Sequence, residues 1–418
     1  MLFFRSSYHV SVMLGLVALG MSQSFLTAIS QFPQLSNFTT LMYNNPGLAG
    51  ALLTSNATSL TKTTVLVPDN SAFDKLEEAL GAPIGSLTVE QLEPVLQYHL
   101  LVDELTTENF TVANGTTRPT FLTGPTYNNR SAGAALGSNG AESDPHNGQV
   151  VFMQASEPEE EESVAGAKRF RLRQTNAQSD RIEVQGGLGH VINMTAIDGY
   201  WDGGRFQIVD KFLQLPLNCT DTIRRWKMLA FRQSLDRTGL GAPLDVEQNV
   251  TCLTPNDAAF LAAGSPNSTA SIFDLTSLLQ FHIINEPLYS NFLQDGQRYR
   301  SVNNQTIQIT ERNGEIFVND AKIINSNVMT NNGVMHVLDR VMSPLDEEVQ
   351  SSSSSSSGTA TTTTSPTTST TPTTSSSSTT TSSAPAASET GGGIGLENPV
   401  SRLGALGYAF PVVWALLL

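Results

Sequence analysis

The sequence predicts an α+β protein that contains two copies of one domain, with helices gathered first and strands mostly last in each copy. Three pairs of strings recur in the same order. They are "TTVLVPDNSAF" (63–73) with "VTCLTPNDAAF" (250–260), "LQYHLL" (96–101) with "LQFHII" (279–284), and "GGRFQIVDKFLQLP" (203–216) with "NGVMHVLDRVMSP" (332–344). Three matched blocks in one order indicate a duplication rather than chance similarity.

Each copy begins with a strand followed by a helix. β-Branched residues fill "TTVLVP" before its proline, and "NSAFDKLEEAL" follows with Asn70 as the expected cap and Phe73 among apolar residues at helical spacing. Residues 86–101 and 271–284 are typical of a helix that leads into an apolar segment, and 305–320 indicates two strands around an Asn-Gly turn. The last block completes the sheet.

The first copy is longer than the second. His99 and Gln207 are 108 residues apart, whereas the matching His282 and His336 are 54 apart, so about 54 residues are inserted within 121–180. The inserted sequence is rich in Gly, Asn and Ser and holds the acidic run "SEPEEEES", which favours solvated loops. A contiguous glutamate run lacks the alternating ligands and turn glycine of a calcium loop.

The two ends of the chain carry processing signals. Residues 1–22 resemble a secretory leader, since a charged start precedes a short apolar run and small residues. Residues 391–418 have the layout of a lipid-attachment (GPI) signal that is removed, with Gly391 as the expected attachment residue. The alternative is a buried helix at the N-terminal end and an amphipathic or buried helix at the C-terminal end. The domains are then expected at 23–215 and 216–345, and 346–390 forms a disordered, O-glycosylated stalk, because 31 of residues 351–390 are Ser or Thr.

Charge and cysteine content exclude some functions. The net charge of −15 argues against nucleic acid as a partner. Cys219 and Cys252 have no zinc-site spacing, and in an exported chain we expect a disulfide between them, although a buried free thiol stays open. Export would also allow N-glycosylation at ten sequons: Asn37, Asn56, Asn109, Asn114, Asn129, Asn193, Asn218, Asn249, Asn267 and Asn304.

The repeated blocks resemble the fasciclin (FAS1) domain family over about residues 24–345. The matching positions are Pro68, Phe73, His99 and Asp210 in the first copy, and Pro255, Phe260, His282, Gly333, His336 and Asp339 in the second. Gln207 departs from the pattern, because it occupies a histidine position. With its stalk and lipid signal, the chain is similar to fungal fasciclin-like surface proteins. The resemblance implies tandem domains in which helices pack on a β-sheet or β-wedge.

The resemblance also implies a function at the cell surface. We expect a GPI-anchored glycoprotein, on the outer face of the plasma membrane and in the cell wall, that mediates adhesion or organises the wall or matrix. Its partners would be wall or matrix polysaccharides, glycoproteins or other surface proteins. Animal relatives are held to bind cells through an Asp-Ile pair, and this chain has Asn327 and Val328 there. Integrin-type recognition is therefore not supported.

Catalysis is not expected, and neither is a cofactor or metal. The chain has no G-x-S-x-G or H-E-x-x-H motif, and His99, His282 and His336 lie in apolar segments, where an imidazole usually makes buried hydrogen bonds. The first alternative is an extracellular module that binds polysaccharide or lipid through the insertion. A secreted hydrolase is the least favoured alternative.

Overall fold

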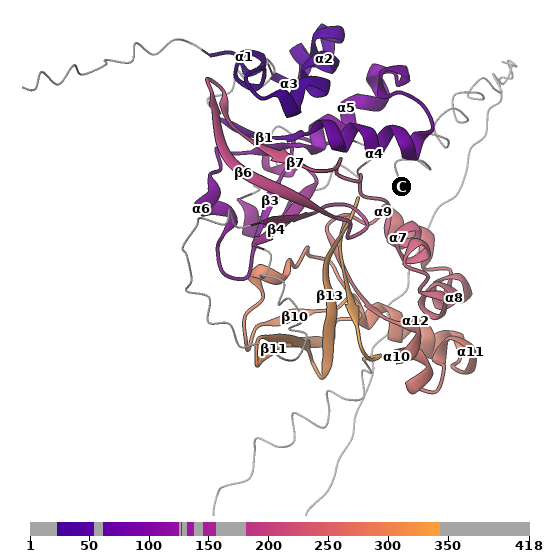
Figure 1. The fold of residues 1–418 in the computed structure, drawn as a ribbon. Coiled ribbons are helices and arrows are strands. Elements are labelled where there is room, and N and C mark those ends of the chain that lie inside the picture. The colour runs from indigo at the N-terminus through magenta and orange to yellow at the C-terminus, as the bar shows by residue number, and fades with distance from the viewer. Residues whose placement is uncertain are drawn as a thin grey trace, which may run out of the picture.

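The computed structural model describes residues 23–53, 62–124, 127, 132–137, 145–155 and 181–342 (Figure 1). The predicted leader, stalk and lipid signal with Gly391 lie outside the described residues, as do Asn56 and Asn129. The described part forms two seven-stranded sheets, each accompanied by its own helices. The predicted α+β architecture of two tandem domains is confirmed.

The first domain is a mixed sheet covered by short helices. Its strands are β1 (Thr63–Pro68), β2 (Leu100–Val102), β3 (Thr116–Pro119), β4 (Val150–Ala155), β5 (Ile182–Gln185), β6 (Val191–Trp201) and β7 (Gly204–Val209). Its helices are α1 (Phe25–Ile29), α2 (Ser36–Asn44), α3 (Pro46–Leu53), α4 (Asn70–Leu80), α5 (Val89–Tyr98) and α6 (Thr107–Phe110). The strand order is β2-β1-β7-β6-β5-β4-β3, with β1 and β7 parallel.

The second domain repeats this plan. Its strands are β8 (Val250–Pro255), β9 (Ile283–Ile284), β10 (Arg298–Arg300), β11 (Thr306–Arg312), β12 (Glu315–Val318), β13 (Ala321–Thr330) and β14 (Gly333–Leu338). Its helices are α7 (Cys219–Arg225), α8 (Leu229–Thr238), α9 (Gly241–Val246), α10 (Asp257–Ala262), α11 (Pro266–Thr269) and α12 (Ile272–Phe281). The strand order, β9-β8-β14-β13-β12-β11-β10, matches that of the first domain strand for strand.

The central parallel pair sets the register of each sheet. β1 and β8 are buried at all six positions, as expected for strands covered on both faces. Gly204 pairs with Thr63, and Gly333 pairs with Val250. A Cβ atom at either glycine would lie 1.9 or 1.8 Å from the carbonyl oxygen of its partner. Glycine is therefore required because the two backbones approach closely.

The helix after the first strand of the first domain starts one residue earlier than the sequence indicated. The side chain of Asp69, not that of Asn70, caps α4 by accepting a hydrogen bond of 2.8 Å from the Ala72 N–H. Asn256 caps α10 in the same way. Asn70 instead accepts a hydrogen bond from the backbone N–H of Asn37, so it joins α4 to α2.

The extra residues of the first domain fall in two connections. Thirty residues (120–149) separate β3 from β4, where five (301–305) separate β10 from β11. A further 26 residues (156–181) separate β4 from β5, where a two-residue turn joins β11 to β12. The expectation of solvated loops is wrong for Tyr127 and Ala132, which are 4% and 0% exposed.

An apolar cluster joins the two domains into one body. It combines Ala132, Val150 and Phe152 of the first domain with Tyr289, Met329 and Val334 of the second. The Tyr289 hydroxyl donates to the carbonyl of Ala132 at 3.0 Å, and β13 packs against β4 and β5. Figure 1 shows β13 rising toward the first sheet. Residues of the insertion thus help to cover the junction.

Polar contacts close the same junction. The Gln185 amide donates to the carbonyls of Ser326 and Asn327 at 3.0 and 2.9 Å. The Trp226 indole N–H donates to the carbonyl of Leu188 at 2.9 Å. These donors bind backbone carbonyls of the opposite domain, so they fix the relative position of the two sheets.

Candidate functional site

Two equivalent histidines join the end of a helix to the segment after the last strand. His99 Nδ1 lies 2.7 Å from the carbonyl oxygen of Val95, and its Nε2 accepts from the Leu213 N–H at 3.0 Å. In His282 the corresponding distances are 2.8 and 2.9 Å, the second to the N–H of Met342. Nδ1 therefore carries the proton in each ring, and both nitrogens are occupied.

The third histidine position of the family holds a different residue in each domain. His336 Nε2 lies 2.7 Å from the carbonyl of Leu288, and Nδ1 accepts from the Asn327 N–H at 3.3 Å. Gln207, in the matching place, accepts from two successive backbone N–H groups at 2.8 and 3.0 Å, and donates to Asp198 at 2.8 Å. An amide can therefore replace the imidazole as a structural hydrogen-bonding group.

These histidines are poorly placed for proton transfer to a substrate. Burial lowers the pKa of His99, His282 and His336 to about 4 in each case. All three side chains are almost completely inaccessible. Among the described residues, no three His, Cys, Asp or Glu side chains are grouped so that they could hold a metal ion. The arrangement supports a structural role.

The family aspartates also hold the sheets together. Asp210 accepts from the Asn193 N–H and Asp339 from the Lys322 N–H, both at 2.8 Å. Each carboxylate thereby fixes the start of the long strand next to it, β6 or β13. The Arg340 Nε lies 3.6 Å from the Asp339 Oδ1.

The two cysteines meet where the helices contact the second sheet. Their sulfur atoms lie 2.9 Å apart, both side chains are buried, and both thiols are free in the structure. The hydrogen bond with Cys252 and burial raise the pKa of Cys219 well above its usual range. The predicted disulfide stays a prediction.

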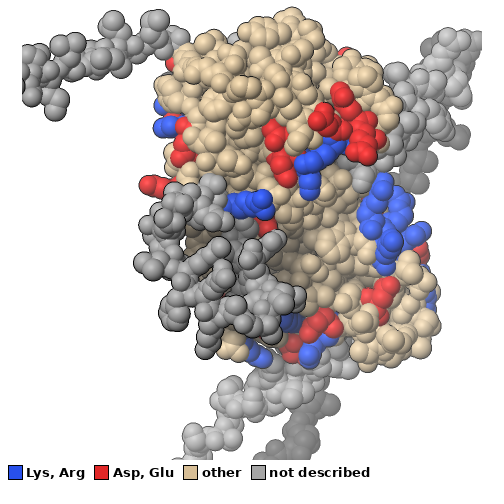
Figure 2. Space-filling model, viewed as in Figure 1, with Lys and Arg blue, Asp and Glu red and all other residues tan. Residues whose placement is uncertain are grey.

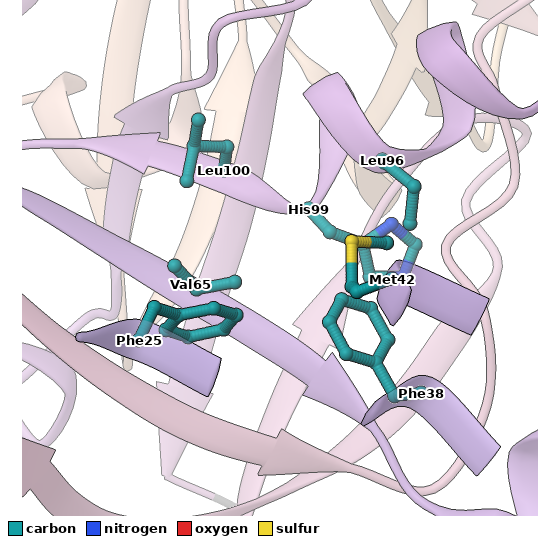
Figure 3. Close-up of a pocket in the computed structure, with 7 residues that line it drawn as sticks. All are labelled: Phe25, Phe38, Met42, Val65, Leu96, His99 and Leu100. Atoms are coloured by element: carbon teal, nitrogen blue, oxygen red, sulfur yellow. The ribbon is translucent and has the colours of Figure 1, made fainter. Parts of the chain in front are cut away.

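The matching contact in the first domain is apolar. Phe25, the first residue of α1, and Val65 of β1 face each other beside His99 (Figure 3). Together with Phe38 and Met42 they line a cavity of only about 10 Å³. The space is too small for a ligand and belongs to the packed core.

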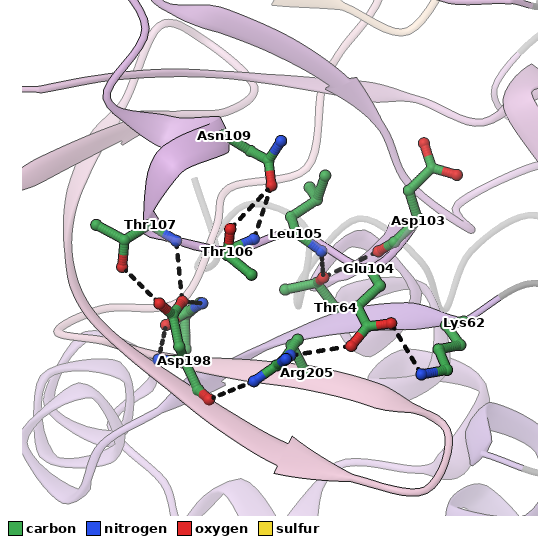
Figure 4. A network of polar contacts seen from close by, with 11 residues as sticks. Lys62, Thr64, Asp103, Glu104, Leu105, Thr106, Thr107, Asn109, Asp198 and Arg205 are labelled. Carbon is green, nitrogen blue, oxygen red and sulfur yellow. Dashed lines mark hydrogen bonds and ion pairs between the residues drawn. The ribbon is translucent and has the colours of Figure 1, made fainter.

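A charged network on the first domain surrounds the turn after β2 (Figure 4). Glu104 binds Lys62 at 3.0 Å and Arg205 at 2.9 Å, and the hydrogen bond from Lys62 is the main reason that the pKa of Glu104 is lowered. The Arg205 guanidinium lies 5.5 Å from the ring centre of the half-exposed Tyr200. Nothing in the motifs indicated this cluster, because its residues are far apart in the sequence.

Comparison with known proteins places the two repeats in one family. The profile described as "Fasciclin domain" matches residues 33–143 and 227–344, more than half of the chain. The chain belongs to the fasciclin family. It is 25% identical over 329 residues to a fasciclin-like arabinogalactan protein of Phaeosphaeria nodorum, covering 78% of this chain and 90% of that one.

Other fasciclin proteins match over shorter stretches. A fasciclin-like arabinogalactan protein of Cercospora beticola is 27% identical over 180 residues, which are 43% of this chain and 48% of the relative. The transforming growth factor-beta-induced protein ig-h3 of Sus scrofa is 25% identical over 34% of this chain and 21% of its own length. Among solved structures, a domain pair from the insect cell adhesion molecule fasciclin I aligns with a TM-score of 0.32 at 17% identity, over 75% of this chain and 98% of that one.

The positions that correspond to the Asp-Ile pair of animal fasciclins are covered in this chain. Asn327 and Val328 are both 0% exposed and lie at the domain junction. The Asn327 side chain accepts from the Ser290 N–H at 2.9 Å and donates to its hydroxyl at 2.6 Å. Both residues are therefore buried in this fasciclin pair and are not available to a partner.

The described sequon asparagines of this fasciclin chain all reach the surface, at least partly. Asn37, Asn114 and Asn304 are exposed, and Asn109, Asn193, Asn218, Asn249 and Asn267 are half-buried. The Asn109 side-chain oxygen accepts from the N–H of Thr106, the N-cap of α6, and Figure 4 shows its amide nitrogen directed away from that bond. Asn193 and Asn267 use their amide nitrogens to bind Asp210 and Gln233. Glycosylation stays a prediction at every sequon.

The surface of this fasciclin pair has one group of basic side chains over α7 and α8 (Figures 1 and 2). Arg224, Arg225, Lys227, Arg232 and Arg237 are all exposed there. Within the described part of the chain, no helix has both the length and the apolar character needed to cross a bilayer.

Proposed function

We propose that this fasciclin protein is a GPI-anchored glycoprotein of the cell surface that mediates adhesion or organises the cell wall or matrix. Support comes from its two fasciclin domains and from fungal relatives that are named fasciclin-like arabinogalactan proteins. The Ser/Thr-rich segment and the apolar end, with Gly391 as the attachment residue, supply the stalk and the anchor of this proposal.

The buried junction is the observation that carries the proposal. Gln185 and Trp226 bind backbone carbonyls of the opposite domain, and the apolar cluster around Tyr289 draws on both sheets. A fixed pair presents one continuous surface to a partner, because little ordering remains to be done when the partner binds. Adhesion and wall assembly require such a lasting, noncatalytic contact.

A noncatalytic role agrees with the chemistry of the histidines. His99, His282 and His336 are buried, and both nitrogens of each ring are occupied by backbone groups. A general acid or base must reach its substrate. We therefore infer that the family histidines support the sheets, and that partner recognition occurs on the outer surface.

The alternative that the insertion binds a ligand receives less support. Its described residues Tyr127 and Ala132 are buried, and Gly133 packs against Pro287 of the second domain. Ligand binding there would compete with the junction. Wall or matrix polysaccharides and surface glycoproteins stay the proposed partners, at another surface.

Anchoring and adhesion are tested separately on intact cells. Phospholipase that cleaves GPI anchors should release the protein into the medium, and a variant truncated before residue 391 should be secreted without the enzyme. Deleting the gene should reduce cell–cell or cell–wall attachment, and the full chain should restore it. Retention after verified cleavage would contradict the anchor, and unchanged attachment in the deletion strain would contradict the adhesion function.

A further inference from the structure

A polar pocket opens between the first three helices of the second domain. It has a volume of about 260 Å³ and is lined by residues of α7, α8 and α9. Ile223 and Leu235, which are 0% and 2% exposed, form its apolar floor. We call it the α7–α9 pocket. Ligand pockets are typically about 300–1,000 Å³ for drug-sized molecules, so this one suits a single small ring.

Two guanidinium groups stand at the rim of the α7–α9 pocket. Arg224 binds Asp221, and the Arg232 Nε lies 3.8 Å from Asp236. Both arginine side chains are about half exposed, at 57% and 48%. A guanidinium has five N–H donors, so each keeps donors for another carboxylate beside its present partner.

Carboxylate oxygens also line the pocket, from Asp236 and Asp245. The Asp245 carboxylate accepts from the Thr220 N–H at 2.9 Å and also from the Thr220 hydroxyl. Burial is the main reason that the pKa of Asp245 is raised. These bonds fix the carboxylate in place, while each of its oxygens can accept more than one hydrogen bond. Gly241 and Ala242 beside it are small, and they leave the hollow open.

We propose that the α7–α9 pocket binds a sugar that carries a carboxylate, namely a uronic acid residue of an acidic polysaccharide. The sugar carboxylate would bind Arg224 and Arg232, which offer paired donors of matching geometry. Its ring hydroxyls would donate to Asp245 and Asp236. The apolar floor would contact the C–H face of the ring.

The local charge explains why such an anion could approach a protein of net charge −15. Residues 220–245, which include the pocket, contain five basic residues and three acidic ones, Asp221, Asp236 and Asp245, and so carry a net positive charge. The basic group faces solvent over α7 and α8 (Figure 2). A singly charged carboxylate is favoured over phosphate because Asp236 and Asp245 would repel the second negative charge of phosphate.

This site depends on the proposed function only for the source of its ligand, which would be the wall or matrix. The binding chemistry can therefore be tested without cells. Purified full-length protein is titrated calorimetrically with trigalacturonate, with an oligosaccharide of glucuronic acid, with the methyl ester of trigalacturonate, and with inorganic phosphate. We expect saturable binding of at least one uronate and no comparable binding of the ester or phosphate.

Matched variants locate the site. Arg232→Gln and Arg224→Gln should each weaken uronate binding about tenfold or more, because each removes a charged hydrogen-bonding partner. Arg225→Gln removes the same charge from α7, the helix of Arg224, but outside the pocket. This variant should change the affinity for uronate less than threefold. Circular dichroism checks that each variant is folded, as expected for exposed residues.

Three results would overturn the proposal: no binding of either uronate, equal binding of the methyl ester, or equal weakening by Arg225→Gln and Arg232→Gln. The proposed function fails in a distinguishable way. If deletion of the gene leaves attachment unchanged while the purified protein still binds uronate through Arg232, the pocket stands and the adhesion role falls. Normal attachment by Arg232→Gln cells would separate adhesion from this pocket.

Discussion

The two domains have the same sheet but different helical surfaces in front of it. From residue 23 to 61 the first domain has no Asp, Glu, Lys or Arg, whereas nine such residues lie between 219 and 247 of the second. The strand order and the roles of Gly204 and Gly333 are nevertheless the same. Duplication has therefore kept the backbone requirements of the sheet and changed the surface that meets solvent.

The contact between helices and sheet differs in the same way. Phe25 and Val65 occupy in the first domain the places that Cys219 and Cys252 occupy in the second, since each pair joins the first helical residue to the third residue of the central strand. One domain fills this contact with an aromatic ring, and the other with two sulfur atoms 2.9 Å apart.

The largest effect is expected at the close approach of the two parallel strands, which both domains share. Gly333→Ala and Gly204→Ala should each destabilise the protein by at least about 4 kcal/mol, because the new Cβ would overlap a carbonyl oxygen of the parallel strand. Urea unfolding followed by circular dichroism measures the loss. Gly85→Ala is the control, since no atom lies within 4 Å of the position that its new methyl group would take. A loss below about 1 kcal/mol in either sheet variant would contradict the close approach.

The cysteine pair should stabilise the second domain in a way that the first domain lacks. If the predicted disulfide forms in the exported protein, its reduction should cost about 3–4 kcal/mol on the chain-entropy estimate for the loop between Cys219 and Cys252. Mass spectrometry of unreduced peptides detects the bond, and unfolding with and without reductant measures its effect. A Cys219→Ser, Cys252→Ser double variant, insensitive to reductant, is the control. Two free thiols in the secreted protein would contradict the disulfide.

Acid should destabilise the second domain more than the first. Its two buried histidines, His282 and His336, have a folded pKa of about 4, whereas the first domain has one such histidine, His99, and the half-buried His190, whose pKa burial also lowers. An unfolded imidazole titrates near 6.5, so the unfolded chain binds more protons between these values. The contribution of these neutral histidines to the free energy of unfolding is therefore fully present above about pH 6.5 and falls as the pH is lowered toward 4.

His336→Gln tests this difference by introducing the residue that stands at Gln207. At pH 5 each buried histidine should cost about 2 kcal/mol relative to pH 7.5, so the variant should lose about 2 kcal/mol less than the wild type over that interval. Urea titrations at both pH values give the two losses. Equal losses in the variant and the wild type would show that His336 does not contribute.

The junction should couple the two domains with a smaller energy. Gln185→Ala removes two hydrogen bonds to the second domain and should cost about 1–3 kcal/mol, because it leaves the carbonyls of Ser326 and Asn327 without this donor. Gln154→Ala, which removes an exposed bond to Glu183 within the first domain, is the control. Hydrogen exchange should show faster exchange in β13 for Gln185→Ala alone.

Sequence reasoning found the repeated sheets because their requirements are local. A glycine at the start of each last strand, a histidine after an apolar helix and a proline at the end of each first strand recur at fixed places in the chain. The histidines were expected to make buried hydrogen bonds, and His99 and His282 do so in equivalent ways. Gly333 directly follows the two-residue turn between β13 and β14, but the reason that glycine is required there is nonlocal, namely the carbonyl of Val250.

The junction and the α7–α9 pocket left no comparable pattern. Gln185 and Trp226 find their partners only after both sheets have formed, and Arg232 and Asp245 have the spacing of ordinary surface residues. The burial of Ala132 also depends on Tyr289, 157 positions later. Predicting such contacts requires knowledge of how distant segments meet, and composition and periodicity do not contain it.

The smallest effect is expected for the helix caps, which test whether α4 and α10 can exchange their cap residues. Asp69→Ala and Asn256→Ala should each cost about 1 kcal/mol, because each removes the side-chain acceptor for one N–H of the first turn, at 2.8 Å in both helices. Asp69→Asn and Asn256→Asp exchange the caps and should stay within about 0.5 kcal/mol of the wild type. A larger loss for Asp69→Asn would mean that its charge, and not only its hydrogen bond, stabilises α4.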